Sequence, residues 1–383
     1  MARERVTRIC KMRITEVRTY PITLTVRPEF FIVSSAGKHA MSRYVIVALH
    51  TDDGAIGLGE ATVVPLWSGE SQGGALALIH DYFAPLLKGR DVDEFESILA
   101  EMDAIALDNH FTKAAIEMAL LDLVGKKRNQ PIFEILGGAV NPNQIPIKFS
   151  IGLREPEDAA AIAAEKVRQG FTAIKLKVGP NPEKDLLRVR LVREAVGEDV
   201  KLNVDTNGGW SVEEAIREIP RYEKFNLAYV EQPTPRWDIE AMAKVRAATG
   251  VKIMADESVF TYWQAEQVIA KKAADLISIY PGKNGGILKS QKICKLAEEA
   301  GVGCHLGSNL EWDIGTAAMT HLAVANKNVP VQQFAVDILG PLYYAVHPQK
   351  KAIQFLDGKV SVPQGPGLGI EINEEEIKSL AEK

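Results

Sequence analysis

The fold is decided by four short apolar segments, AIKLKV (173–178), LNVDT (202–206), AYVEQ (228–232) and KIMADE (252–257). Each has the length and residue types of a buried β-strand. Amphipathic helical patterns such as EKDLLRVRLVREAVG (183–197) lie between them. The segments recur about every 25 residues, which is the period of a βα unit. We therefore predict a parallel sheet with helical crossovers for this part of the chain.

The same alternation extends along the chain in both directions. We predict eight strands, near residues 145–151, 173–178, 201–206, 228–231, 252–256, 275–280, 302–307 and 331–335. Eight strands that alternate with helices are typical of a TIM-type α/β barrel. The alternative is a doubly wound open sheet, which is disfavoured because no GxGxxG turn follows the first strand.

The residues before the barrel follow another pattern. β-rich runs extend from Arg13 to Ala61, and helical patterns follow near residues 75–87, 92–105 and 110–127. Strands followed by helices indicate an α+β domain. We predict three parts: an N-terminal α+β domain over residues 12–140, a barrel over 141–339, and a segment over 340–383 that packs back on the N-terminal domain.

The bulk composition excludes several classes of protein. The 383 residues are 46% hydrophobic and 25% charged, with a net charge of −5, which is ordinary for a soluble globular protein. Neither the basic runs of a nucleic-acid binder nor a membrane-spanning apolar stretch occurs. Cys10, Cys294 and Cys304 have no disulfide or metal-ligand spacing, and the basic N-terminal residues lack the apolar stretch of a signal peptide. We expect a cytoplasmic protein, and we interpret the first eleven residues as a dispensable extension.

Three carboxylates end successive predicted strands: Asp205, Glu231 and Asp256. In a barrel these strand ends are neighbours on the face where active sites are found. Converging carboxylates repel one another, and a hard cation with oxygen ligands, such as Mg²⁺, relieves the repulsion. Each acid alone is equally well explained as the cap of the following helix, but three at one-unit spacing favour a metal site.

Two lysines precede these acids in the strand AIKLKV. Strand alternation places Lys175 and Lys177 on one face, opposite three apolar residues, so both are predicted to point into the barrel. Two neighbouring ammonium groups depress each other's pKa, and a lysine tuned in this way can act as a base near pH 7. The alternative is that both side chains extend to water at an edge.

These residues resemble the enolase superfamily, and specifically its muconate lactonizing subgroup. The likeness extends over nearly the whole chain from Met12. Its motifs, in order, are WSGES (67–71), AAIEMALLDLVGK (114–126), Lys175-x-Lys177, VDTNGGW (204–210), VEQP (230–233), ADES (255–258), NGGI (284–287) and GSNLEWDIGTAA (307–318). Each motif is weak alone, but their order and spacing together are specific.

The resemblance implies a modified (β/α)7β barrel of TIM type under an α+β cap, formed by the N-terminal region and the C-terminal tail. It implies Mg²⁺ or Mn²⁺ bound by the three strand-end acids, and an enolate-type intermediate. Lys177 would move the proton next to a substrate carboxylate, and Lys175 would supply positive charge. Glu311 matches the acidic residue that the subgroup places opposite the lysine pair. The resemblance also suggests a small carboxylic-acid substrate and a homo-oligomer.

The sequence departs from the subgroup at the end of the sixth strand. Members usually have a second lysine there, but this chain has Tyr280. Lys283 comes three residues later, where we expect it in the loop and exposed to solvent. Racemisation needs groups on both faces of the carbon, so one lysine favours a one-sided reaction, unless Tyr280 or Lys283 takes the second role. We interpret His305 as a packing residue.

A muconate-type cycloisomerase is therefore the leading functional hypothesis. The alternatives are a dehydratase of a hydroxy or sugar acid, a racemase or epimerase of an amino-acid derivative, and a non-catalytic metal-binding barrel. Substrate specificity is expected from the cap loops near residues 25–40 and 64–72. The candidate substrate-binding residues are Phe30, Phe31, His39, Trp67, Asn207 and Asn309.

Overall fold

The computed structural model describes residues 11–35, 37–347, 349–351 and 353–381. Cys10 and the predicted N-terminal extension, apart from Lys11, lie outside these residues. None of the helices in the described ranges is long and apolar enough to cross a membrane.

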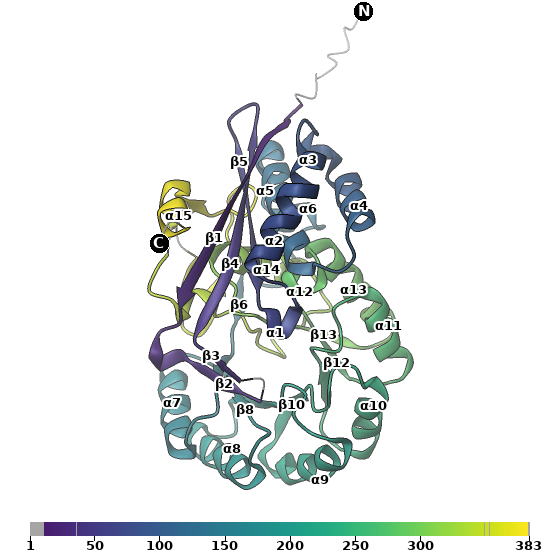
Figure 1. Cartoon of the computed structure of the whole chain (residues 1–383). Coiled ribbons are helices and arrows are strands. Elements are labelled where there is room, and N and C mark those ends of the chain that lie inside the picture. The colour runs from purple at the N-terminus through teal and green to yellow at the C-terminus, as the bar shows by residue number, and fades with distance from the viewer. Residues whose placement is uncertain (1–10, 36, 348, 352, 382–383) are drawn as a thin grey trace, which may run out of the picture.

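The predicted parallel sheet is confirmed as a curled sheet of seven strands in the order β13-β12-β11-β10-β9-β8-β7 (Figure 1). The strands are β7 (Phe149–Ile151), β8 (Ala173–Lys177), β9 (Lys201–Asp205), β10 (Leu227–Glu231), β11 (Ile253–Ala255), β12 (Leu276–Ile279) and β13 (Gly303–Leu306). The helices outside it are α7 (Pro156–Arg168), α8 (Pro182–Val196), α9 (Val212–Tyr222), α10 (Ile239–Ala248), α11 (Tyr262–Ala270), α12 (Pro281–Asn284), α13 (Ile287–Glu299) and α14 (Asp313–Ala325).

The prediction of an eighth strand over residues 331–335 is wrong. The chain turns there, since the backbone N–H groups of Gln333 and Phe334 both donate to the carbonyl of Pro330. The barrel is closed just afterwards by a single bridge between Val336 and Ile147, while the N–H of Asp337 donates to the carbonyl of Leu306 in β13. This closure turns the segment carrying Asp337 toward the barrel axis.

The cap contains a three-stranded antiparallel sheet in the order β1-β4-β5 and a group of helices (Figure 1). Its strands are β1 (Ile14–Thr25), β2 (Ile32–Ser34), β3 (Gly37–His39), β4 (Met41–Thr51) and β5 (Ile56–Val63). Its helices are α1 (Pro65–Ser68), α2 (Gln72–Leu78), α3 (Ala84–Leu87), α4 (Phe95–Ile105), α5 (His110–Arg128) and α6 (Ile132–Ile135). The hairpin of β2 and β3 pairs outside the main sheet and lies between the cap and the barrel.

The C-terminal region returns to the cap. Its elements are β14 (Gln349–Lys351), β15 (Phe355–Leu356), β16 (Lys359–Ser361), β17 (Glu371–Ile372) and α15 (Glu374–Ala381). Helix α15 lies beside β1 in Figure 1, where the hydroxyl of Tyr20 donates to Glu374 at 2.7 Å. Strand β16 pairs with β6 (Gln144–Pro146), which interrupts the strand predicted over residues 145–151. The three domain boundaries stay a prediction.

Two buried glutamates of the cap bind the N-termini of barrel helices. Glu60 in β5 accepts hydrogen bonds from the backbone N–H groups of Trp312 at 2.6 Å and Gly315 at 3.0 Å, at the start of α14. Glu117 in α5 accepts from the N–H of Ile287 at the start of α13. A carboxylate at a helix N-terminus satisfies unpaired N–H groups and meets the positive end of the helix dipole. These contacts orient the cap on the barrel.

We expect Gly59→Ala to lower the melting temperature, because β5 lies directly against α5. A Cβ atom at this position would overlap the carbonyl oxygen of Ala115. Overpacking of this kind costs about 1–3 kcal/mol of unfolding free energy. Thermal denaturation would measure the loss. Gly73→Ala is the matched control, because a Cβ atom there meets nothing within 4 Å; equal melting temperatures for the two variants would contradict the prediction.

Candidate active site

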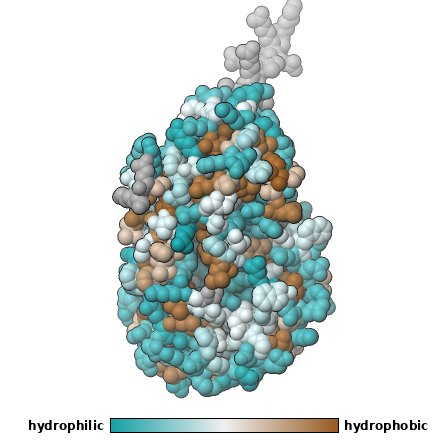
Figure 2. Space-filling model, in the orientation of Figure 1, coloured by the Kyte–Doolittle hydropathy of each residue, from teal (hydrophilic) through white to brown (hydrophobic). Residues whose placement is uncertain are grey.

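A cavity of about 230 Å³ lies between the carboxyl ends of the barrel strands and the cap. From the barrel it is lined by Lys175, Lys177, Asp205, Asn207, Glu231, Asp256, Tyr280 and Asp337, and from the cap mainly by Ile32, Lys38, His39, Val64, Leu66 and Trp67. Figure 2 shows apolar residues in the middle of this face, over the region of α1. The two strand lysines and the three strand-end acids that the sequence placed at the site therefore reach one cavity, with a charged floor and a largely apolar roof.

Lys177 and Asp205 form the first charged pair of the floor. They are partners in the parallel register of β8 and β9, and the Lys177 ammonium donates to Asp205 Oδ2 at 2.5 Å and to Asn207 Oδ1 at 2.9 Å. Burial opposes ionisation of Asp205, but the ammoniums of Lys177 and Lys175 outweigh it and hold the pKa of Asp205 below its ordinary value. Lys177 is thus held in place at its Nζ atom.

Lys175 lies among three carboxylates. Its Nζ is 2.5 Å from Asp337, 3.4 Å from Glu231 and 3.6 Å from Asp205. Burial favours the neutral amine, but these anions raise the pKa of Lys175 well above its ordinary value. The expectation that the two lysines depress each other's pKa is therefore wrong for Lys175, because its carboxylate partners outweigh the repulsion from a second ammonium. Lys175 stays a cation.

Two further carboxyl groups, those of Glu231 and Glu257, have raised pKa values. Burial, and then the charge of Asp205, raise the pKa of Glu231 to about 7. Burial, and then the charge of Asp256, raise the pKa of Glu257 to about 8. Asn207 donates to Oε1 of Glu257 at 2.9 Å, but Oε2 is buried without a partner. The sequence analysis missed Glu257, although an adjacent acid pair at a strand end was a visible signal.

The prediction that Lys283 is exposed to solvent is wrong. Its side chain is fully buried, and its ammonium donates to Asp256 Oδ1 at 2.7 Å and to the backbone carbonyls of Asp256 at 2.9 Å and Ser278 at 2.6 Å. The reason is α12, because one helical turn after β12 carries residue 283 back over the end of the strand. Lys283 therefore pairs with the third strand-end acid.

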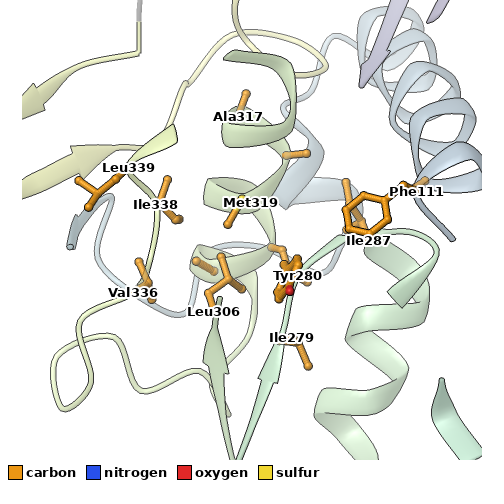
Figure 3. Packing of buried hydrophobic residues seen from close by; sticks show 14 of the residues in the cluster. Phe111, Ile279, Tyr280, Ile287, Leu306, Ala317, Met319, Val336, Ile338 and Leu339 are labelled. Atoms are coloured by element: carbon orange, nitrogen blue, oxygen red, sulfur yellow. The ribbon is translucent and has the colours of Figure 1, made fainter. Parts of the chain in front are cut away.

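Tyr280 stands across the barrel from Lys177, because β9, β10 and β11 separate β8 from β12 in the sheet order. Figure 3 shows its ring at the end of β12, among the apolar side chains that surround α14. The ring stacks on Trp67 with centroids 5.7 Å apart. Lys283 Nζ lies 4.7 Å from the centroid of the same ring. An aromatic wall thus faces Lys177.

The sequence analysis also missed three buried residues of the barrel interior. Lys148 donates to the hydroxyl of Tyr229 at 2.7 Å and lies 3.8 Å from Asp337. Burial, and then the charge of Lys175, lower the pKa of Lys148 to about 8. The strand pattern IPIKF held a signal for Lys148, since a lysine interrupts its apolar residues. Asp337 gave no comparable signal, because it follows a segment that forms no strand.

The other predicted site residues are divided between the cavity and its surroundings. His39, Trp67, Asn207 and Asn309 line the cavity. Phe30 packs on Phe149 and Tyr343, and Phe31 lies against Lys38, with Nζ 4.4 Å from the ring centroid.

Glu311 and His305, both near the seventh strand, are not part of the cavity lining. Glu311 accepts from Ser308 Oγ at 2.6 Å and from the N–H of Asn309, so its carboxylate faces its own loop. Burial raises the pKa of Glu311 to about 7. His305 is buried 3.2 Å from Lys148, in keeping with a packing residue.

The donor set fits a hard divalent cation. As they stand, Asp205, Glu231 and Asp256 face lysine ammoniums, and within the described ranges no group of three or more acidic, histidine or cysteine side chains encloses an ion. Their oxygens are nevertheless the ligand type that Mg²⁺ prefers. Asp205 and Glu231 are also register partners, and burial, together with the charges of neighbouring carboxylates, raises the pKa of Glu231 and of Glu257. A divalent cation would neutralise that charge.

A capped βα barrel with charged side chains at the carboxyl ends of its strands defines a class of barrel enzymes. The family model "Enolase C-terminal domain-like" matches residues 158–376, and the model "Mandelate racemase / muconate lactonizing enzyme, N-terminal domain" matches residues 14–137. The chain therefore belongs to the enolase superfamily, in its mandelate racemase/muconate lactonizing group, and is an enzyme of that family.

Its relatives differ in activity. The chain is 34% identical to an L-Ala-D/L-Glu epimerase of Clostridium acetobutylicum, over 85% of this chain and 90% of that one. It is 32% identical to muconate cycloisomerase 1 of Rhodococcus opacus, over 92% and 94%. The crystal structure of a dipeptide epimerase from Cytophaga hutchinsonii, complexed with Mg and D-Ala-L-Val, matches with a TM-score of 0.90 and 32% identity, over 96% and 98%. Family membership therefore leaves the particular reaction open.

Proposed function

We propose that this enzyme transfers a proton on one face of the carbon next to the carboxylate of a small organic acid, with Lys177 as the acid or base. The proposal is supported by the difference between the two sides of the cavity, of which one presents a lysine and the other an aromatic ring. Lys177 lines one side, whereas the opposite side presents the ring of Tyr280, and Lys283 is held by three oxygen acceptors beneath it. A one-base reaction follows from a single available lysine.

We infer that Asp205, Glu231 and Asp256 hold Mg²⁺ or Mn²⁺, which fits the Mg in the related dipeptide epimerase structure. When bound, such a cation holds a substrate carboxylate and stabilises the negative charge that develops on its oxygens. Lys177 then accepts or delivers the α-proton at Nζ, with Asp205 and Asn207 fixing its position. Lys175, anchored by Asp337, adds a permanent positive charge to the floor.

Cycloisomerisation of a muconate-type acid is the first specific candidate, supported by the likeness to muconate cycloisomerases. Dehydration of a hydroxy acid is the second, because Tyr280 takes the place of a second lysine across the cavity from Lys177. Epimerisation is less favoured than the likeness to epimerases alone suggests, because it needs a proton donor and an acceptor on opposite faces of the carbon.

Deuterium exchange in D₂O tests the one-base proposal. The purified enzyme with Mg²⁺ is incubated with chiral carboxylic acids, and mass spectrometry and chiral chromatography follow exchange and configuration. We expect exchange at the α-carbon with retained configuration. Equal rates of exchange and racemisation would contradict a one-base reaction, and no exchange in any acid would favour a non-catalytic barrel. Loss of muconate absorbance or formation of a 2-oxo acid separates the two specific candidates.

A lysine at position 280 is expected to add the missing second base. For Tyr280→Lys we expect the ratio of racemisation to exchange to rise about 10²-fold, the size of a general acid–base contribution. Chiral chromatography of the exchanged acid measures the ratio. Tyr280→Met is the matched control, because it removes the phenol without adding a base. The same ratio in both variants would show that position 280 does not reach the second face.

We further propose that the enzyme works in the cytoplasm as a homo-oligomer, on a small carboxylic acid and without nucleic acid or membrane. The cytoplasm is supported by Cys294 and Cys304, which are both buried and form no disulfide. Size-exclusion chromatography with light scattering tests the oligomer, and a monomer at micromolar concentration would contradict it.

A further inference from the structure

Gln232 is the glutamine of the VEQP motif, and the proposed proton transfer gives it no role. Its side chain is fully buried, and every hydrogen-bonding site of its amide is in use. The Oε1 atom accepts from the backbone N–H groups of Asp256 at 3.0 Å and Ser258 at 3.2 Å. The Nε2 atom donates to the carbonyl of Thr234 and to the hydroxyl of Ser258, both at 2.8 Å. The amide therefore ties the end of β10 to the end of β11.

The backbone of Gln232 makes a second connection, to the end of β9. Its carbonyl oxygen accepts from the N–H of Gly208 at 2.8 Å and from the hydroxyl of Thr206 at 2.5 Å. Its own N–H donates to the carbonyl of Met254 in β11 at 2.8 Å. The strands β9, β10 and β11 carry the three proposed metal ligands at their carboxyl ends. One residue thus contacts all three of the strand ends that would hold the cation.

The backbone conformation of Gln232 is unfavourable for a residue of this type. Its φ angle is +39°, in the left-handed region that residues other than glycine, asparagine and aspartate rarely adopt. Such a conformation costs free energy and persists only where the surrounding contacts enforce it. The hydrogen bonds of the amide and of the backbone supply these contacts. A strained residue that is held so completely beside a predicted ligand indicates a functional constraint at this position.

We propose that Gln232 is a positioning residue of the metal site, which fixes the carboxyl ends of β9, β10 and β11 relative to one another. The inference rests on the proposed function, in which Asp205, Glu231 and Asp256 hold the cation. Gln232 is not itself a ligand, because two backbone N–H groups occupy its Oε1 atom. Mg²⁺ demands near-octahedral geometry with short bonds, whereas Ca²⁺ tolerates longer and more varied ones. Loosening the strand ends should therefore weaken the binding of Mg²⁺ more than that of Ca²⁺.

Isothermal titration with MgCl₂ and with CaCl₂ tests the proposal without turnover. For Gln232→Ala we expect Mg²⁺ to bind about 10-fold to 10²-fold more weakly, as for other residues that support metal ligands. The preference for Mg²⁺ over Ca²⁺ should fall by about ten-fold. Gln232→Gly should melt at a higher temperature than Gln232→Ala, because glycine adopts a positive φ angle without steric cost. Both variants should nevertheless lose the same Mg²⁺ affinity, whereas a merely structural role would make affinity follow stability.

Gln264→Ala is the matched control. The Gln264 side chain also accepts from two backbone N–H groups, those of Phe260 at 2.7 Å and Thr261 at 3.0 Å, but it belongs to the capping box of α11. This variant should melt at a lower temperature than the wild type and keep the wild-type Kd of both cations.

The inference alone is overturned if Gln232→Ala keeps the wild-type preference for Mg²⁺, or if Gln264→Ala loses as much of it. Failure of the proposed metal site appears differently, as absence of Mg²⁺ binding in the wild type or as unchanged Mg²⁺ affinity in Glu231→Gln. Either of those results would overturn the metal site and this inference together.

Discussion

Replacing Lys177 by alanine is expected to lower the rate of α-proton exchange by about 10³-fold, within the range of general acid–base contributions. Its Nζ atom is the amine positioned by Asp205 and Asn207 beside the cavity, and no other lysine that lines the cavity floor can replace it. Lys175 is the nearest alternative, but Asp337, Glu231 and Asp205 keep it protonated. Mass spectrometry of acids incubated in D₂O measures the rate.

Lys177→Arg separates proton transfer from charge. Arginine keeps the positive charge beside Asp205 but does not release a proton near neutral pH. We expect exchange to be lost in both variants, while Mg²⁺ affinity and melting temperature change little in Lys177→Arg. Exchange at the wild-type rate in either variant would remove Lys177 from the mechanism.

Glu231→Gln is expected to weaken Mg²⁺ binding by at least about 10²-fold and to abolish exchange with it, since changes to the surroundings of a metal ligand alone already cost up to that factor. The substitution removes one of three anionic donors. The fold should survive, because Lys175 keeps its contact with Asp337 at 2.5 Å. Isothermal titration with MgCl₂ and thermal denaturation give the two readouts.

Asp256→Asn is compared with Glu231→Gln to separate the effect on Mg²⁺ binding from the effect on stability. It removes the carboxylate partner of Lys283, which is fully buried and would keep only carbonyl and amide acceptors. Breaking a buried pair in this way typically costs about 3–5 kcal/mol. We therefore expect loss of Mg²⁺ binding in both variants but a marked fall in melting temperature only in Asp256→Asn. Mg²⁺ affinity near the wild-type value in Glu231→Gln would rule out the proposed metal site.

The failures of sequence-based prediction share a cause, as Lys283 and the last barrel strand illustrate. The exposure of Lys283 was misjudged because a helical turn, and not an extended loop, follows β12. The eighth strand was wrongly predicted because its apolar pattern also fits a turn that closes the barrel through single hydrogen bonds. Both features depend on contacts with strands that are distant in the chain, and a local sequence pattern does not contain these contacts.

The sequence by itself determined the barrel, the α+β domain that precedes it, and the meeting of Lys175, Lys177, Asp205, Glu231 and Asp256 at one cavity. It could do so because side chains alternate along a strand and the carboxyl ends of parallel strands share one edge, so residue spacing is enough. Only the tertiary structure decided which lysine each acid pairs with, that Asp337 completes the floor, and that Tyr280 lines the cavity against Trp67. These features depend on side-chain packing between elements far apart in the chain, which no local spacing encodes.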